Sequence, residues 1–246
     1  MRHLVISDLH ENYPALQRVF ATAEQAGGVD DIWFLGDALG HCDGSLHCDR
    51  VACLRELQDR KAICILGNWE GWLLRPERDT EGYQRKHAND LQRMRAGLPT
   101  DVVDYIRSWK DKVELGDFTL AHGAPEVGNN HTRYEHPPEP WEIYMRSTET
   151  EMVTRFFFRN QIRTRHLVFG HTHCPGYFHY NGTGVRWTFL TSEIASKEIN
   201  FHEYGGRFAF NPGSLSYNDV KECKPNFPGT ALILDDTRCT FRFLTL

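Results

Sequence analysis

The segment LVFGHTH, residues 167–173, joins a short apolar run to two histidines that are separated by a single residue. Short runs rich in Val, Ile, Leu and Phe that end in Gly and polar residues are typical of buried β-strands. Four other segments follow the same plan, and they are LVISDLH (4–10), IWFLGDALGH (32–41), ICILGNWE (63–70) and FTLAHGAPE (118–126). The sequence therefore predicts five buried strands, each followed by polar side chains at its carboxyl end.

Helical patterns lie between the first of these strands. Pro14 suits the first turn of a helix, residues 15–26 continue the pattern, and Gly27 and Gly28 provide a stop. Residues 49–60 form a second amphipathic segment. Alternation of strand, helix and strand at this spacing indicates βαβ units and an α/β fold.

The middle of the chain shows helical and loop patterns in place of the strand–helix alternation. Residues 75–112 have a helical pattern that is broken at 97–99, and Thr100 is expected to cap the helix that follows. Residues 124–140 are rich in Pro and His and predict a loop. Residues 141–160 predict a further helix.

Strand and turn patterns dominate from residue 176 onward, and they close in a hairpin whose turn is expected at 235–238. The chain shows no internal repeat and no clear linker. We therefore expect a single domain over residues 1–246, with an α/β front and a β-rich back. Helical and loop insertions are expected around 75–112 and 124–160.

Composition argues against several classes of protein. The formal net charge is −5 and basic residues form no run, which argues against general nucleic-acid binding. No apolar stretch is long enough to span a bilayer, and the first residues lack the pattern of a signal peptide. The seven cysteines show no paired CxxC spacing, so we expect reduced thiols in a cytoplasmic protein.

Seven residues able to bind a metal stand at the five predicted strand ends. They are Asp8, His10, Asp37, Asn68, His122, His171 and His173. In open α/β sheets, ligands bind at the carboxyl edge of the strands, so these side chains are expected to converge. Seven ligands exceed one tetrahedral site, and they suit two cations a few ångström apart that share a bridging carboxylate.

The ligand types limit which metal ions and which reaction are expected. A mixed nitrogen and oxygen set without thiolate favours Mn, Fe, Zn, Co or Ni, and we expect Mn to serve best in an assay. Two adjacent cations clamp a phosphate and lower the pKa of a shared water, which then attacks as hydroxide. Asn68 would supply a neutral oxygen ligand that adds no further negative charge.

The order of these motifs resembles the calcineurin-like metallophosphoesterase superfamily over nearly the whole chain. The matching motifs are Asp8-Leu9-His10, Gly36-Asp37, Gly67-Asn68, His122-Gly123 and Gly170-His171-Thr172-His173, and Asn211-Pro212-Gly213-Ser214 resembles a hallmark of its small bacterial and archaeal members. The resemblance implies a sandwich of two β-sheets flanked by helices, in the order α/β/β/α. It also implies that Asp8, His10, Asp37 and His173 hold one metal, that Asp37, Asn68, His122 and His171 hold the other, and that Asp37 bridges them.

The sequence departs from the family pattern at Trp69, where the family usually has a His that stabilises the transition state or protonates the leaving oxygen. An indole N–H does not titrate, so another imidazole is expected to take this role. His41 is the first candidate, ahead of His131 and His136 in the long loop. Trp69 is expected to line the substrate pocket, either as an apolar lid or as a surface on which the leaving group stacks.

Two further departures follow the first and second strands. The segment GDALGHCDG lacks the Arg that follows the bridging Asp in protein Ser/Thr phosphatases of the superfamily. Because His cannot copy the bidentate phosphate contacts of Arg, a protein phosphatase is only an alternative. Glu11 stands where small members commonly have Gly, and we expect it to change only the local turn.

These observations predict a cytoplasmic, dinuclear metal-dependent phosphoesterase that acts on a small phosphate ester, a nucleotide or a dinucleoside polyphosphate. Monoesters and diesters both remain open as substrates, as do the native metal and the oligomeric state. The alternative from another class is a catalytically weak scaffold that binds protein partners, as the retromer subunit of similar fold does. A metallo-β-lactamase-type hydrolase is disfavoured because no HxHxDH run exists.

Overall fold

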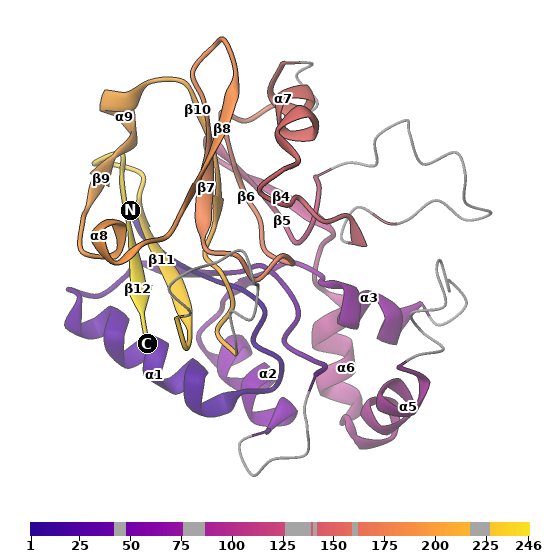
Figure 1. Ribbon diagram of the computed structural model, residues 1–246. Coiled ribbons are helices and arrows are strands. Elements are labelled where there is room, and N and C mark those ends of the chain that lie inside the picture. Colours follow the sequence, from indigo (N-terminus) through magenta and orange to yellow (C-terminus); the bar gives the residue numbers. More distant parts are fainter. Residues whose placement is uncertain (42–47, 76–86, 126–138, 140–141, 159–161, 217–226) are drawn as a thin grey trace.

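The computed structural model describes residues 1–41, 48–75, 87–125, 139, 142–158, 162–216 and 227–246. Two six-stranded sheets form the centre of the fold (Figure 1). The first sheet has the order β3 (Ile63–Cys64), β2 (Asp31–Phe34), β1 (Arg2–Ile6), β11 (Thr230–Asp235), β12 (Thr240–Thr245) and β9 (Ile199–Asn200). The second has the order β4 (Lys112–Leu115), β5 (Phe118–Ala121), β6 (His166–Val168), β10 (Arg207–Asn211), β7 (Gly176–Tyr180) and β8 (Val185–Phe189).

The strands that precede the predicted ligands run parallel within each sheet. In the first sheet, β1 pairs in parallel with β2, and β2 with β3. In the second sheet, β5 pairs in parallel with β6. Because neighbouring parallel strands end at the same edge, the polar segments that follow them are brought together.

Helices surround the two sheets. They are α1 (Tyr13–Gln25), α2 (Arg50–Asp59), α3 (Asn68–Leu74), α5 (Ala88–Gly97), α6 (Thr100–Arg107), α7 (Thr150–Phe158), α8 (Ser192–Ala195) and α9 (Phe201–Tyr204). The first two begin with side-chain caps, since Asn12 accepts the Ala15 N–H at 3.1 Å and Asp49 accepts the Ala52 N–H at 2.9 Å.

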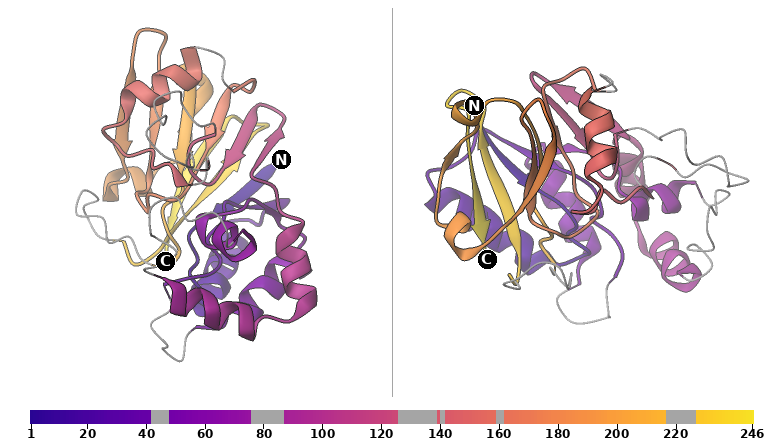
Figure 2. Two further views of the ribbon diagram at one scale, coloured as in Figure 1. Left: turned by 90° about the vertical axis from the view of Figure 1, so that its right-hand side faces the viewer. Right: turned by 45° about the horizontal axis from the view of Figure 1, so that its top comes forward.

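Three layers of buried apolar side chains hold the sandwich together. Figure 2 shows the sheets and helices between which they lie. Side chains of β1 alternate between two of them, because Leu4 and Ile6 belong to the layer shared with α1 and α2, whereas Val5 belongs to the layer between the sheets. On the outer face of the second sheet, Phe156 of α7 joins the layer that contains Phe178. The predicted α/β/β/α sandwich is therefore confirmed.

Local predictions met with mixed success. The first two predicted helices match α1 and α2. The helix predicted over 141–160 is shorter, because α7 begins only at Thr150. Thr100 lies inside α6 and Pro99 is the N-cap, so the predicted side-chain cap was wrong. Most of the loop predicted at 124–140 lies outside the described residues.

The cysteines also differ from expectation. Cys48 and Cys174 each take part in a disulfide bond, whereas Cys53, Cys64 and Cys239 are free thiols. Disulfide formation depends on which segments the fold brings together, and the spacing of cysteines along the chain does not reveal this. Across the described part of the chain, no helix has both the length and the apolar character needed to cross a membrane.

Candidate metal centre

The loops after β1, β2, β3, β5 and β6 carry the seven predicted ligands. Six of these side chains belong to buried residues, and these six are Asp8, His10, Asp37, Asn68, His122 and His171. The seventh, His173, has 13% of its side chain exposed. Burial of so many polar groups in one place costs free energy unless they have partners, which makes the site a candidate for a bound ion.

The ligand atoms gather in two groups. Asp8, His10 and His173 offer three atoms that all lie within 4.8 Å of one another. Asp37, His122 and His171 offer a second set with the same spacing. The first sheet supplies two members of the former group and one of the latter, and the second sheet supplies the remaining three.

Asn68 completes the second group. Its side-chain oxygen lies 3.1 Å from Nε2 of His122, and the same nitrogen lies 3.4 Å from Oδ2 of Asp37. An amide oxygen, a carboxylate and an imidazole therefore converge at the first turn of α3. Mixed oxygen and nitrogen ligands of this kind suit Mn, Fe, Zn or Co.

Backbone carbonyl oxygens orient three of the imidazoles. Nδ1 of His10 lies 3.0 Å from the carbonyl oxygen of Leu39, and Nδ1 of His122 lies 2.7 Å from that of Leu35. A nitrogen facing a carbonyl carries the proton, so Nε2 of each ring presents its lone pair to the centre. His171 is oriented in the opposite sense, with Nε2 lying 3.3 Å from a carbonyl oxygen and Nδ1 remaining as the ligand atom.

The first group fits a cation better than it fits direct hydrogen bonding. Nε2 of His10 and Nε2 of His173 face each other at 3.1 Å. Oδ1 of Asp8 lies 3.2 Å from the same His173 nitrogen, yet it is buried and accepts no hydrogen bond from the described residues. A divalent cation among these three atoms would satisfy all of them.

The pKa values of three candidate ligand histidines show which of these rings are neutral in the metal-free protein. Burial, followed by the charge of His173, lowers the pKa of His10 to about 4. Burial, followed by the charge of His122, lowers the pKa of His171 to about 3. Burial also lowers the pKa of His122, but the Asp37 carboxylate outweighs it and raises this pKa to about 9. Neutral imidazoles at His10 and His171 are the form that binds metal, whereas His122 would release a proton when a metal binds.

The backbone is strained at most of the ligands. Positive φ angles occur at Asp8 (53°), His10 (48°), Asp37 (58°), His171 (64°) and His173 (53°). Residues with a Cβ rarely adopt this left-handed region, and each instance typically costs about 1–3 kcal/mol. This shared conformation turns the chain between Asp8 and His10 and between His171 and His173, so that both side chains of each pair can face the same site.

Glu70 holds the loop after β2 against the start of α3. Its carboxylate is fully buried and accepts the N–H groups of Asp37 at 2.9 Å, Leu39 at 3.1 Å and Gly67 at 3.0 Å. The two loops approach so closely that a Cβ on Gly67 would lie 2.2 Å from Oδ1 of Asp37. Only glycine fits at that position.

Asn211 and Ser214 support the first group from the second sheet. The amide of Asn211 donates to the Gly170 carbonyl at 3.0 Å and to the Thr172 hydroxyl at 2.9 Å. The hydroxyl of Ser214 donates to the carbonyl of Asp8 at 2.8 Å. This segment therefore positions the loops that carry the ligands.

Trp69 is almost completely buried, with 1% of its surface exposed. Its indole packs on Gly40 so tightly that a Cβ there would lie 2.1 Å from the ring. The rings of His41 and His87 contact the indole, with centroids 5.0 Å and 4.8 Å away. The predicted place of Trp69 in the substrate pocket stays a prediction, and the neighbours of its indole include these two imidazoles, Gly40 and the ring of Trp72.

His41 lies at the edge of the centre. It is exposed, and its ring centroid is 4.8 Å from that of His10. The other proposed proton donors, His131 and His136, lie outside the described residues. Sequence reasoning missed His87, which lies just before α5 and has no strand-end signal. It also missed Tyr144, whose ring stacks on His171 at 3.8 Å.

Comparison with known proteins places these features in a family. Residues 1–175 match the calcineurin-like phosphoesterase family. A curated relative, the symmetrical bis(5'-nucleosyl)-tetraphosphatase of Glaesserella parasuis serovar 5 (strain SH0165), is 27% identical over 118 residues. This match covers 48% of the chain and 37% of the relative, so the chain spans well under two thirds of that protein.

Solved structures show the same fold. A metallophosphoesterase from Sphaerobacter thermophilus is similar with a TM-score of 0.72 and 22% identity, over 100% of this chain and 88% of that one. A hypothetical protein from Pyrococcus horikoshii OT3 is similar with a TM-score of 0.65 and 14% identity, over 100% of this chain and 87% of that one. At these identities the likeness concerns the fold.

Proposed function

The chain belongs to the calcineurin-like phosphoesterase family, and we propose that its seven strand-end side chains hold two divalent cations used to hydrolyse phosphate esters. One cation would be held by Asp8, His10, Asp37 and His173, and the other by Asp37, Asn68, His122 and His171. The observation that carries the proposal is the 3.1 Å approach of two imidazole nitrogens beside a buried carboxylate oxygen that lacks a hydrogen-bond partner among the described residues.

When bound, the two cations would neutralise the phosphoryl oxygens and activate a water for attack on phosphorus. The chain contributes the geometry. Glu70 accepts the N–H of Asp37 and so holds the residue proposed to bridge the two cations, and the backbone carbonyls of Leu39 and Leu35 orient His10 and His122. Positioning of this kind is a large part of catalysis in phosphoryl transfer.

His41 is proposed to protonate the leaving oxygen. Its ring is exposed and next to His10, so a substrate held at the centre could reach it. Trp69 is proposed to serve as the apolar surface that holds His41 in place, and to border the substrate pocket there. General acid catalysis typically contributes about 10²- to 10⁴-fold to a rate.

A nucleotide is the proposed substrate class, and a dinucleoside polyphosphate is a specific candidate. Support comes from the tetraphosphatase that resembles 48% of the chain. A protein phosphatase is less well supported, because His41 lies in the short segment after Asp37 where those enzymes carry an Arg. Manganese is the proposed assay metal on the basis of the ligand types.

The test is a hydrolysis screen on protein reconstituted with Mn, Co, Ni, Zn or Fe. Aryl monoesters, aryl diesters and dinucleoside polyphosphates serve as substrates, and Asp37→Asn serves as the matched inactive control. We expect Mn-dependent turnover of at least one class, with a loss of 100-fold or more in the control, on the order seen when a transition-state contact is removed. Equal activity of both proteins would contradict the proposed site.

A further inference from the structure

A small cavity lies beside the candidate metal centre, between the loops after β1 and β2 and the helices α2 and α5. It is lined by Glu11, Gly40, His41, Arg50, Asp90, Arg93 and Met94. Its volume is about 70 Å³. About 10–15 Å³ of such space holds one water, so the cavity has room for a small polar group such as a phosphoryl.

The cavity is close to the proposed position of the reacting phosphate. His41 lines it, and the ring of His41 is 4.8 Å from that of His10 in the first ligand group. One imidazole therefore separates the cavity from the candidate metal centre.

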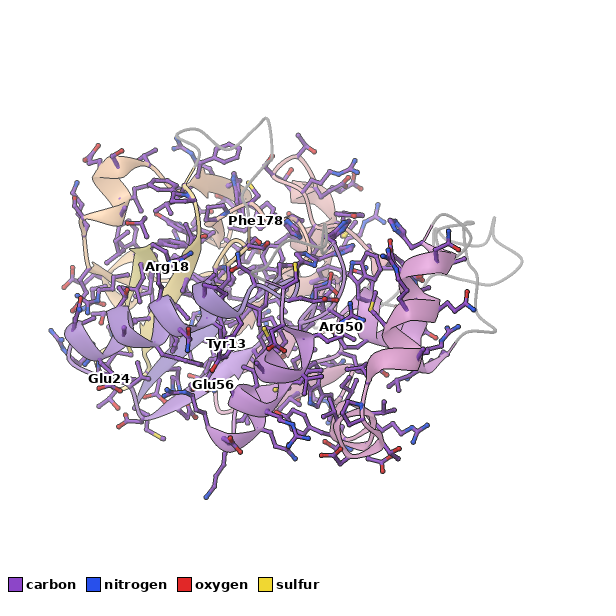
Figure 3. All side chains as sticks on the ribbon, turned by 90° about the horizontal axis from the view of Figure 1, so that it is seen from below. Tyr13, Arg18, Glu24, Arg50, Glu56 and Phe178 are labelled. Carbon is purple, nitrogen blue, oxygen red and sulfur yellow. The ribbon has the colours of Figure 1, made fainter. Side chains whose placement is uncertain are left out.

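Two guanidinium groups line the cavity from different helices. Arg50, labelled in Figure 3, projects from α2, and Arg93 projects from α5. Arg50 contacts Oε2 of Glu11 through Nε and Nη2, both at 3.1 Å, and its Nη1 donates no hydrogen bond to any described residue. Arg93 pairs with Asp90 through Nη2 and has 72% of its side chain exposed. Each guanidinium has five N–H donors, so both keep donors for a ligand.

Glu11 fixes one side of the cavity. Its carboxylate is 1% exposed, and it accepts the N–H of Gly40 at 3.2 Å as well as the Arg50 contacts. The same carboxylate thus joins the loop after His10 to the loop that carries His41. The expectation that Glu11 affects only a local turn was wrong, because it anchors an arginine beside the centre.

We propose that this cavity binds a second phosphoryl group of the substrate, with Arg50 and Arg93 donating to its oxygens. Arginine forms bidentate, charge-assisted bonds to phosphate, which makes the pair suitable for such an oxyanion. The enzyme would then prefer compounds with adjacent phosphoryl groups, such as nucleoside polyphosphates, over simple monoesters. This inference rests on the proposed function for the position of the first phosphoryl group.

The first test compares Arg93→Gln with Arg107→Gln. Both arginines are exposed and pair with an Asp three residues earlier in their helices, but Arg107 does not line the cavity. Binding of inorganic diphosphate to Mn-loaded protein is measured by calorimetry, alongside hydrolysis of an aryl monophosphate. Loss of one charge-assisted contact at a partly exposed site should weaken diphosphate binding about tenfold in Arg93→Gln. Arg107→Gln should change neither quantity.

Asp90→Asn supplies a change of opposite sign. It removes the carboxylate that occupies Arg93, so diphosphate should bind more tightly while the aryl monophosphate is turned over as before. General disruption of α5 would weaken binding instead. Equal diphosphate affinities in wild type, Arg93→Gln and Asp90→Asn would overturn the inference. It would also be overturned if Arg93→Gln lowered diphosphate affinity and aryl monophosphate turnover by the same factor.

The two measurements separate failure of this inference from failure of the proposed function. Turnover of the aryl monophosphate depends on the metal centre and His41, and it does not require Arg93 or Asp90. If wild type turns over that ester but Arg93→Gln leaves diphosphate affinity unchanged, only the second phosphoryl site is wrong. If wild type hydrolyses none of the screened phosphate esters with any metal, the proposed function fails, and diphosphate binding that depends on Arg93 would still support the cavity as an anion site.

Discussion

Replacing Glu70 with Gln should destabilise the fold by about 2–3 kcal/mol, because one carboxylate serves three backbone N–H groups. Oε2 accepts the N–H groups of Asp37 and Gly67, and Oε1 accepts that of Leu39. Gln has a single side-chain oxygen. It can keep the first two bonds, but its amide NH₂ then faces the Leu39 N–H.

The magnitude follows from that one lost acceptor. A buried N–H left without a partner costs about 1–3 kcal/mol, and hydrogen bonds to a charged group are worth about 1.5–3 kcal/mol each. The site is fully buried, so water cannot replace the lost oxygen. An estimate of 2–3 kcal/mol is a large part of the 5–15 kcal/mol that stabilises a typical domain.

Urea unfolding of metal-free protein at about pH 9 measures this loss directly, because burial and then the charge of Asp37 raise the pKa of Glu70 to about 7 and the carboxylate is ionised at the higher pH. Glu151→Gln is the matched control, since Glu151 also stands in the first turn of a helix but has 81% of its side chain exposed. The control should change the free energy of unfolding by no more than about 0.5 kcal/mol. If Glu70→Gln also changed the free energy of unfolding by no more than about 0.5 kcal/mol, the proposed role of this carboxylate as acceptor for three backbone N–H groups would be refuted.

Three other changes test separate parts of the site and fold. His173→Ala should abolish one metal and retain the other by elemental analysis, and loss of both ions from a folded protein would contradict the division into two groups. Trp69→His should raise turnover of alkyl monoesters about tenfold more than that of aryl esters, worth about 1.4 kcal/mol, and an unchanged dependence on leaving-group pKa would show that proton delivery is not altered. His166 is buried, accepts the Phe208 N–H at 3.1 Å, and has its pKa lowered to about 3 by burial and then by nearby arginines. The unfolded chain therefore binds a proton that the native state excludes as the pH falls below about 6.5, so stability should drop by about 2 kcal/mol between pH 8 and pH 5. His166→Asn keeps an acceptor without titrating, and a pH dependence of unfolding identical to wild type would contradict this assignment.

The strand ends were predictable because two signals coincide in the sequence. Runs such as LVIS and LVFG mark buried strands, and the residues after them carry metal-binding atoms. Parallel pairing then brings Asp8 and Asp37 together in one sheet, as the βαβ pattern requires. The continuous apolar run of β1 likewise anticipates a strand buried on both faces.

Other features depend on tertiary contacts that no periodicity encodes. The left-handed backbone at His171 and His173 depends on tertiary contacts, since residues with a Cβ adopt it uncommonly even though His does so more often than most. His87 comes from a helical region distant in sequence, and only the fold places its ring against Trp69. The ion pair of Glu11 with Arg50 joins two elements for the same reason.

The length of α7 illustrates the limit of helical propensity. Residues 141–149 are predicted to be part of a helix, yet the described chain at 142–149 passes beside the metal centre before α7 begins at Thr150. Tyr144 stacks on His171 in that segment, and the backbone carbonyl of Glu142 lies 3.3 Å from Nε2 of the same imidazole. Contacts of this kind compete with helix formation and are absent from a local reading of the sequence.

Anomalous diffraction from crystals of the Mn-reconstituted protein is the most direct test of the dinuclear centre. The account predicts two peaks about 3.5–4 Å apart, the separation usual for paired metals. One peak should lie among Asp8, His10 and His173, and the other among Asp37, His122 and His171. Absence of ordered metal at these residues, or ions bound only elsewhere on the protein, would contradict the account.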